Sequence, residues 1–153
     1  MRKFYKYIIA FSILFLPAQL FTNNNSTIIN KYNAAINLEA ELKYQEAIPV
    51  LKELLAIDPE NENFNFHLAV SIIEGKNAEN PLPYLEKSIR NISKTYRSNY
   101  KQRSAPPIAL EYLAKEYHLN YRFADAIAFY TQYLNYIDKR DLESVNKIHK
   151  YIA

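Results

Sequence analysis

"AIPVLKELL" at residues 47–55 and "PLPYLEKSI" at residues 81–89 align with each other when the chain is shifted against itself by 34 residues. The aligned pairs keep similar side chains: Pro49 with Pro83, Leu51 with Leu85, and Leu55 with Ile89. The same shift places Ala34-Ala35 on Leu68-Ala69. Periods of about 20 to 50 residues are typical of helical units that stack along one axis. The sequence therefore predicts a repeat architecture.

A third copy, "ALEYLAKEYHLNYRFADAIAFYTQYL", occupies residues 109–134 and is displaced by 11 additional residues. Each copy contains two segments with apolar residues at i, i+3, i+4 and i+7, which is the spacing of an amphipathic helix. The expected fold is an all-α solenoid of three helical hairpins with a C-terminal capping helix. We place the hairpins at about 27–57, 61–92 and 105–137, an insertion at 93–104, and the cap at about 141–152.

Composition agrees with this fold and excludes several functions. The chain of 153 residues has one glycine and no cysteine, which argues against glycine-rich phosphate loops and excludes thiol chemistry. Three of the 19 Lys and Arg residues lie within the first six positions, so 16 remain against 16 Asp and Glu. A near-neutral domain has no basic field that would attract nucleic acid.

Residues 1–21 have the features of a secretory signal. Arg2, Lys3 and Lys6 precede the apolar run "IIAFSILFL" at residues 8–16, and "PAQLF" follows it. The run is too short to span a bilayer comfortably. We expect export, with a linker at 22–26 before a domain at 27–153. An uncleaved N-terminal anchor is the alternative, and it would provide the chain's membrane contact.

Small and aromatic residues recur at fixed places of the repeats: Ala35, Ala69 and Ala114 in the first helices, Tyr44 and Phe123 before the second helices, and Ala47 and Ala126 within them. With Asp58-Pro59 closing the first unit, this pattern resembles a tetratricopeptide repeat (TPR) array. The second copy departs from the pattern at Ala78 and Pro81, and no tryptophan marks a first helix. The resemblance implies a TPR-type α-solenoid.

A narrower resemblance is carried by "AIPVLKELLAIDPENENFNFHLAVSII", "PLPYLEKSIRNIS" and "APPIALEYLAKEYHLNYRFADAIAFYTQYL". These stretches resemble the N-terminal TPR segment of Bacteroidota envelope proteins. In that family the segment precedes a β-propeller and an OmpA-like peptidoglycan-binding domain, and some members belong to the type IX secretion and gliding apparatus. The resemblance implies a periplasmic or cell-envelope scaffold. The two further domains have no counterpart in these 153 residues, so peptidoglycan binding is not implied.

Repeat phase predicts an inner wall that is built by the first helices of the hairpins. Nine residues are expected to line it as a partner-binding groove: Tyr32, Asn33, Ile36, Phe66, His67, Val70, Tyr112, Lys115 and His118. An aromatic and aliphatic groove suits an amphipathic helix or an extended apolar segment of another protein. A C-terminal helix that fills the groove is the alternative.

The insertion carries cations with tyrosines between them and no acidic residue. We expect it to form a solvated end of the second hairpin, and contact with an acidic protein or a lipid headgroup is the alternative. The possible basic contact comprises Lys94, Arg97, Lys101 and Arg103.

The sequence shows no pattern that indicates catalysis or metal binding. His67, His118 and His149 are isolated from one another, and Ser71 and Ser144 lack a glycine elbow. We therefore predict a non-enzymatic exported scaffold that binds another envelope protein or a peptide segment, with no cofactor, metal, small-molecule substrate or nucleic acid. The alternative is a truncated N-terminal arm of a larger peptidoglycan-anchored OmpA-like envelope or secretion-system protein.

Overall fold

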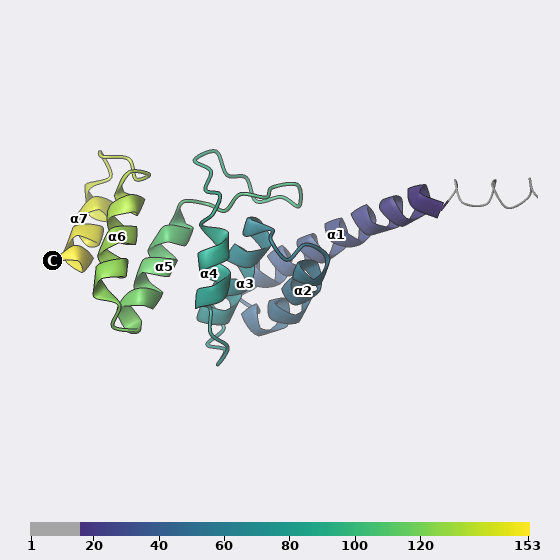
Figure 1. Cartoon of the computed structure of the whole chain (residues 1–153), viewed down its shortest axis with the longest axis horizontal. Helices are drawn as coiled ribbons and strands as arrows, with labels where there is room; N and C mark the ends of the chain where they lie inside the picture. The colour runs from purple at the N-terminus through teal and green to yellow at the C-terminus, as the bar shows by residue number, and fades with distance from the viewer. Residues whose placement is uncertain (1–15) are drawn as a thin grey trace, which may run out of the picture.

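The computed structural model describes residues 16–153, with side chains described from residue 25 onward. This part of the chain forms seven α-helices and no β-strand, and neighbouring helices pack in sequence order (Figure 1). The expected all-α fold class is confirmed, and the sequential packing is solenoid-like. The helices are α1 (Leu16–Ala40), α2 (Tyr44–Ile57), α3 (Glu62–Glu74), α4 (Leu82–Ser88), α5 (Ile108–Leu119), α6 (Phe123–Leu134) and α7 (Leu142–Ile152).

Helix α1 is longer than the sequence analysis expects. It includes residues 22–26, which were expected to form a linker, and residues 16–21, which were expected to end the leader. Residues 1–15, and with them most of the expected signal, lie outside the described residues. None of the described helices combines the length and the hydropathy that crossing a bilayer requires.

The same turn closes α1, α3 and α5, the first helices of the three hairpins. Among the described residues, positive φ angles occur at Leu42, Lys76 and Tyr121, which are 34 and then 45 residues apart. After each of these helices, a backbone N–H bonds to the carbonyl five residues earlier: Lys43 to Leu38, Asn77 to Ile72, and Arg122 to Tyr117. This is the hydrogen bond of a Schellman cap, in which glycine is the usual left-handed residue. The turn therefore repeats with the spacing that the sequence alignment shows.

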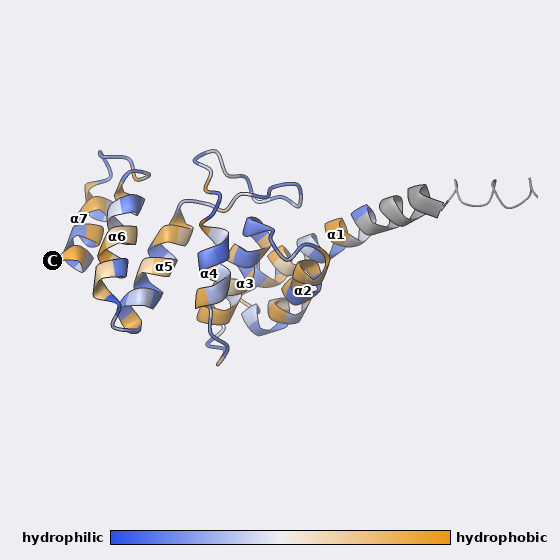
Figure 2. Ribbon diagram, viewed as in Figure 1, coloured by the Kyte–Doolittle hydropathy of each residue, from blue (hydrophilic) through white to orange (hydrophobic). Residues whose placement is uncertain are grey.

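Small residues allow the paired helices to approach closely. The five alanines at the repeat positions have at most 1% of their surface exposed: Ala35, Ala47, Ala69, Ala114 and Ala126. Larger side chains fill two main clusters, one around Leu51 and Phe64, the other around Leu113 and Tyr130. Hydrophilic residues dominate the long loop between α4 and α5 (Figure 2).

Helix α7 closes the C-terminal end by packing on α6. The side chain of Asp141 accepts a hydrogen bond from the backbone N–H of Ser144 and so caps the helix. Ile148 is buried against the second cluster, whereas Leu142, the first residue of the helix, is exposed. The helix therefore contributes to the core mainly through its C-terminal half.

Glu111 of α5 joins α7 to the rest of the fold through an ion-pair triad. Its carboxylate is 4% exposed and lies 2.7 Å from the Nζ atom of Lys115 and 2.9 Å from that of Lys147. Burial acts to raise the pKa of Glu111, but the hydrogen bonds from the two lysines outweigh it, so the pKa lies below its usual value. The ionised carboxylate therefore stabilises the native state.

We expect Glu111→Gln to lower the free energy of unfolding by about 1–2 kcal/mol at neutral pH, because both lysines lose a charged partner but can reach solvent. A carboxylate with a depressed native pKa stabilises the fold above its unfolded pKa, and this stability is lost as the pH falls through the native pKa. The difference between wild type and variant should therefore begin to shrink near the unfolded pKa of about 4.3 and disappear once the pH lies below the lower native pKa. Denaturant unfolding at several pH values measures this difference in unfolding free energy. Glu143→Gln is the control, because it is the same substitution at an exposed position. A difference that persists in acid would contradict this assignment.

Candidate binding site on the inner wall

The loop of residues 93–104, which we call the strap, joins α4 to α5 and folds back over α1 and α3 (Figure 1). Its two ends are held together by a β-bridge between Ile92 and Ala105. The backbone N–H of Asn63 in α3 donates to the carbonyl of Arg103 at 3.0 Å. The strap is therefore fixed at its base and supported by α3.

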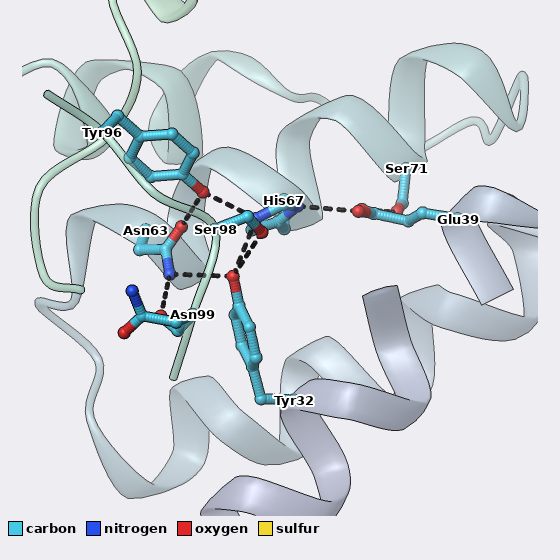
Figure 3. A network of polar contacts seen from close by, with 8 residues as sticks. All are labelled: Tyr32, Glu39, Asn63, His67, Ser71, Tyr96, Ser98 and Asn99. Atoms are coloured by element: carbon cyan, nitrogen blue, oxygen red, sulfur yellow. Dashed lines mark hydrogen bonds and ion pairs between the residues drawn. The ribbon is translucent and has the colours of Figure 1, made fainter. Parts of the chain in front are cut away.

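Side chains from α1 and α3 contact the middle of the strap (Figure 3). The hydroxyl of Tyr32 lies 2.8 Å from that of Ser98. The amide nitrogen of Asn63 donates to the hydroxyl of Tyr32 and to the carbonyl of Asn99, each at 3.2 Å. The amide oxygen of Asn63 accepts from the hydroxyl of Tyr96 at 2.5 Å. One buried asparagine thus connects both helices to the strap.

His67 extends this network toward α1. Its Nε2 atom lies 3.0 Å from the hydroxyl of Tyr96, and its Nδ1 atom lies 2.7 Å from the carboxylate of Glu39. The other carboxylate oxygen of Glu39 accepts from the hydroxyl of Ser71 at 2.8 Å. Burial raises the pKa of Tyr96 well above its ordinary value, which keeps the phenol protonated as a donor.

The network contains a histidine, a carboxylate and a serine, but their geometry does not form a nucleophile and its base. A nucleophilic serine must lie within hydrogen-bond reach of the base that takes its proton. Ser71 instead donates to Glu39, while both ring nitrogens of His67 have other contacts. This arrangement is suited to holding the strap rather than to activating a hydroxyl.

The structure places the nine predicted wall residues in three different environments. Tyr32, Phe66 and His67 are buried, with 2%, 8% and 7% of their surface exposed; Ile36, Val70, Tyr112 and Lys115 are half-buried; Asn33 and His118 are exposed. Over the first two hairpins the strap bonds to two of these residues, Tyr32 and His67. The role of these nine residues in binding a partner stays a prediction.

The strap itself differs from the solvated insertion that the sequence analysis expects. Tyr96 is half-buried, because Asn63 and His67 of α3 offer hydrogen-bond partners that the repeat spacing of the sequence does not show. Ser104 is buried at the base of the strap. The four cations are exposed, as expected for a solvated segment: Lys94, Arg97, Lys101 and Arg103. Two of them have partners in the fold, since Arg103 binds both carboxylate oxygens of Asp58 and Lys94 donates to the carbonyl of Asn135.

A second candidate surface lies at the tip of the α5–α6 hairpin, and sequence reasoning missed it. We call it the hairpin-tip patch; its residues are Leu119, Tyr121, Phe123, Ile127 and Tyr151, all of them exposed. The rings of Tyr121 and Phe123 are 6.1 Å apart. A pocket of about 260 Å³ beside the patch is lined by Lys115, His118, Leu119, Tyr130 and Tyr151.

Three asparagines at the start of α3 are buried, but only one of them bonds to the strap: Asn61, Asn63 and Asn65. Buried amide side chains need hydrogen-bond partners. Asn61 and Asn65 find theirs locally, between Asp58 and Phe64. Asn63 finds its partners on α1 and on the strap, and the sequence does not distinguish it from its two neighbours.

No group of three or more His, Cys, Asp or Glu residues in the described part of the chain is placed to hold a metal ion. Comparison with protein-family models and with curated protein sequences found no match to this chain.

Proposed function

We propose that this chain is a non-enzymatic, TPR-type scaffold that binds another protein of the bacterial cell envelope. The exposed apolar surface of the hairpin-tip patch carries the proposal. Contiguous exposed apolar residues on a soluble domain typically mark an interaction site. The turn that recurs at 34 and 45 residues supports the repeat type, and the charged and apolar sequence of residues 1–21 supports export.

The chemistry of the pocket indicates what kind of partner segment fits. Its walls are apolar and aromatic, but Lys115 and His118 also line it. Lys115 shares the carboxylate of Glu111 with Lys147, so these three groups together carry one excess positive charge. We therefore expect a partner segment that has an aromatic or aliphatic side chain next to a carboxylate.

The hypothesis is tested with a photo-crosslinking amino acid placed at Tyr121 in cells that produce the chain. Leu42 is the matched control, because it occupies the equivalent turn, with the same φ of 59°, and is 73% exposed. Crosslinking should be specific to position 121. With the crosslinked protein purified, the Tyr121→Ser/Phe123→Ser variant should bind it at least about tenfold more weakly, whereas Leu42→Ser should change the affinity by no more than roughly twofold.

Equal crosslinking from both positions would count against the proposal. So would normal affinity of the double variant, provided that circular dichroism shows its helices intact. Both residues lie at the surface, with Tyr121 82% and Phe123 49% exposed, so a folding defect is not expected.

A further inference from the structure

The strap lies on the inner wall in the manner of a bound peptide. Tyr96 and Ser98, two residues apart, each bond to the wall through a hydroxyl group, while Thr95, Arg97 and Ser98 stay exposed. Backbone carbonyls of the strap are also contacted, by the side chain and the N–H of Asn63. The wall therefore recognises both the backbone and two particular side chains.

The contacts that hold the middle of the strap are mainly polar. The hydroxyl groups of Tyr96 and Ser98 and the backbone carbonyl of Asn99 bond to Tyr32, Asn63 and His67, and water can replace each of these bonds if the strap lifts. One strap residue, Tyr100, is half-buried and packs against the first core cluster. Most of the apolar contacts of that cluster lie between the helices themselves, and the rings of Tyr32 and Phe64 pack against each other beneath the network. Opening of the strap should therefore cost less than unfolding of the helices.

The base of the strap allows it to lift without separating from the fold. The bridge between Ile92 and Ala105 and two backbone hydrogen bonds, Ser93 to Ala105 and Ala105 to Asn91, hold both ends together. Residues between these ends can leave the wall as a closed loop. The fold thus contains a hinge with fixed ends and a segment held by exchangeable bonds.

We propose that the strap is an intramolecular lid that occupies the inner wall of the first two hairpins in place of a partner. The partner is an extended protein segment that carries a tyrosine and, two residues later, a small hydroxyl residue, as Tyr96 and Ser98 do in the strap. This inference rests on the proposed function as a protein-binding scaffold but concerns a different surface from the hairpin-tip patch.

Opening of the lid is measured by limited trypsin digestion, because the strap contains four exposed cleavage sites, at Lys94, Arg97, Lys101 and Arg103. Tyr96→Phe removes a hydroxyl that contacts both Asn63 and His67 and should speed cleavage within the strap about tenfold. The matched control is Tyr100→Phe, which removes the same atom from a strap tyrosine outside the network and should change the rate by no more than roughly twofold. Equal rates for the two variants would overturn the proposal.

Recognition by the wall is tested with a synthetic peptide of residues 93–103, "SKTYRSNYKQR". In the recipient chain, residues 94–103 are replaced by a Gly/Ser segment of equal length. This chain should bind the peptide at least about tenfold more tightly than the intact chain, in which the tethered strap competes at an effective concentration on the order of millimolar. A peptide with Tyr96→Phe and Ser98→Ala should bind at least about tenfold more weakly.

Failure of a helical recipient chain to bind the peptide would show that the wall does not recognise an extended segment. If the replacement prevents folding, the Tyr96→Phe chain serves as the recipient instead. It too should bind the peptide more tightly than the intact chain, and a failure to bind would again count against recognition by the wall. Neither measurement uses the envelope partner or the hairpin-tip patch. A negative result here therefore leaves the proposed function standing, and a failure of the Tyr121 crosslink leaves the lid standing.

Discussion

Phe64→Ala should lower the free energy of unfolding by about 3–5 kcal/mol, the largest loss that we expect from a single substitution in this chain. Phe64 is 1% exposed and belongs to the cluster that joins α1, α2 and α3. Its ring packs on that of Tyr32, with the centroids 5.8 Å apart. Truncation removes apolar contacts and leaves a cavity below the network, which cannot collapse without moving α1 toward α3.

Denaturant unfolding followed by circular dichroism measures this loss. Phe123→Ala is the matched control, because it is the same substitution at a residue that is 49% exposed, and it should cost roughly 1 kcal/mol or less. Similar losses at the two positions would mean that Phe64 is not the core residue that its burial indicates.

Asn63→Ala should be the second most damaging change, at about 2–3 kcal/mol. The side chain is fully buried and takes part in three hydrogen bonds, with Tyr32, Asn99 and Tyr96. Its removal leaves the carbonyl of Asn99 without this donor. It also takes one hydrogen-bond partner from the hydroxyl group of Tyr32 and one from that of Tyr96. Because the bonds lie between α1, α3 and the strap, the loss should affect the strap before the helices.

Two measurements examine this prediction. Asn33→Ala, at an exposed position of α1, should change the unfolding free energy by roughly 0.5 kcal/mol or less. A double-mutant cycle between Asn63→Ala and Tyr96→Phe should give a coupling energy of about 0.5–3 kcal/mol, as expected for residues in one network. Additive effects of the two substitutions would contradict a direct hydrogen bond between these side chains.

Local rules in the sequence determined the helices and several of their ends. The apolar spacing predicts helices because residues three and four apart share a face. Asn61 caps α3 by accepting the N–H of Phe64, and asparagine is a preferred residue at this position. Proline starts α4 and α5, where a missing N–H costs little. These features depend on neighbours within about one helical turn, so a single sequence is sufficient to find them.

The end of α4 could not be predicted from local sequence, because it depends on contacts with residues elsewhere in the chain. The sequence predicts a second hairpin that continues to about residue 92, whereas α4 ends at Ser88. The carbonyl of Asn91 accepts from the N–H of Ala105, and Ile92 forms the bridge. These bonds draw residues 91–92 away from the helix axis. The turns at Leu42, Lys76 and Tyr121 were hidden for another reason, since none of them has the glycine that usually marks a left-handed cap.

The repeat, the all-α class and the small residues between paired helices were thus determined by the sequence itself, because they follow from periodicity. The position of the strap was decided only by the tertiary structure. Its bonds join residues far apart in the chain: Tyr32 to Ser98, Asn63 to Tyr96, and His67 to Tyr96. The strap has no periodicity of its own, and hydrogen bonds of this kind depend on donors and acceptors that meet only after α1 and α3 have packed.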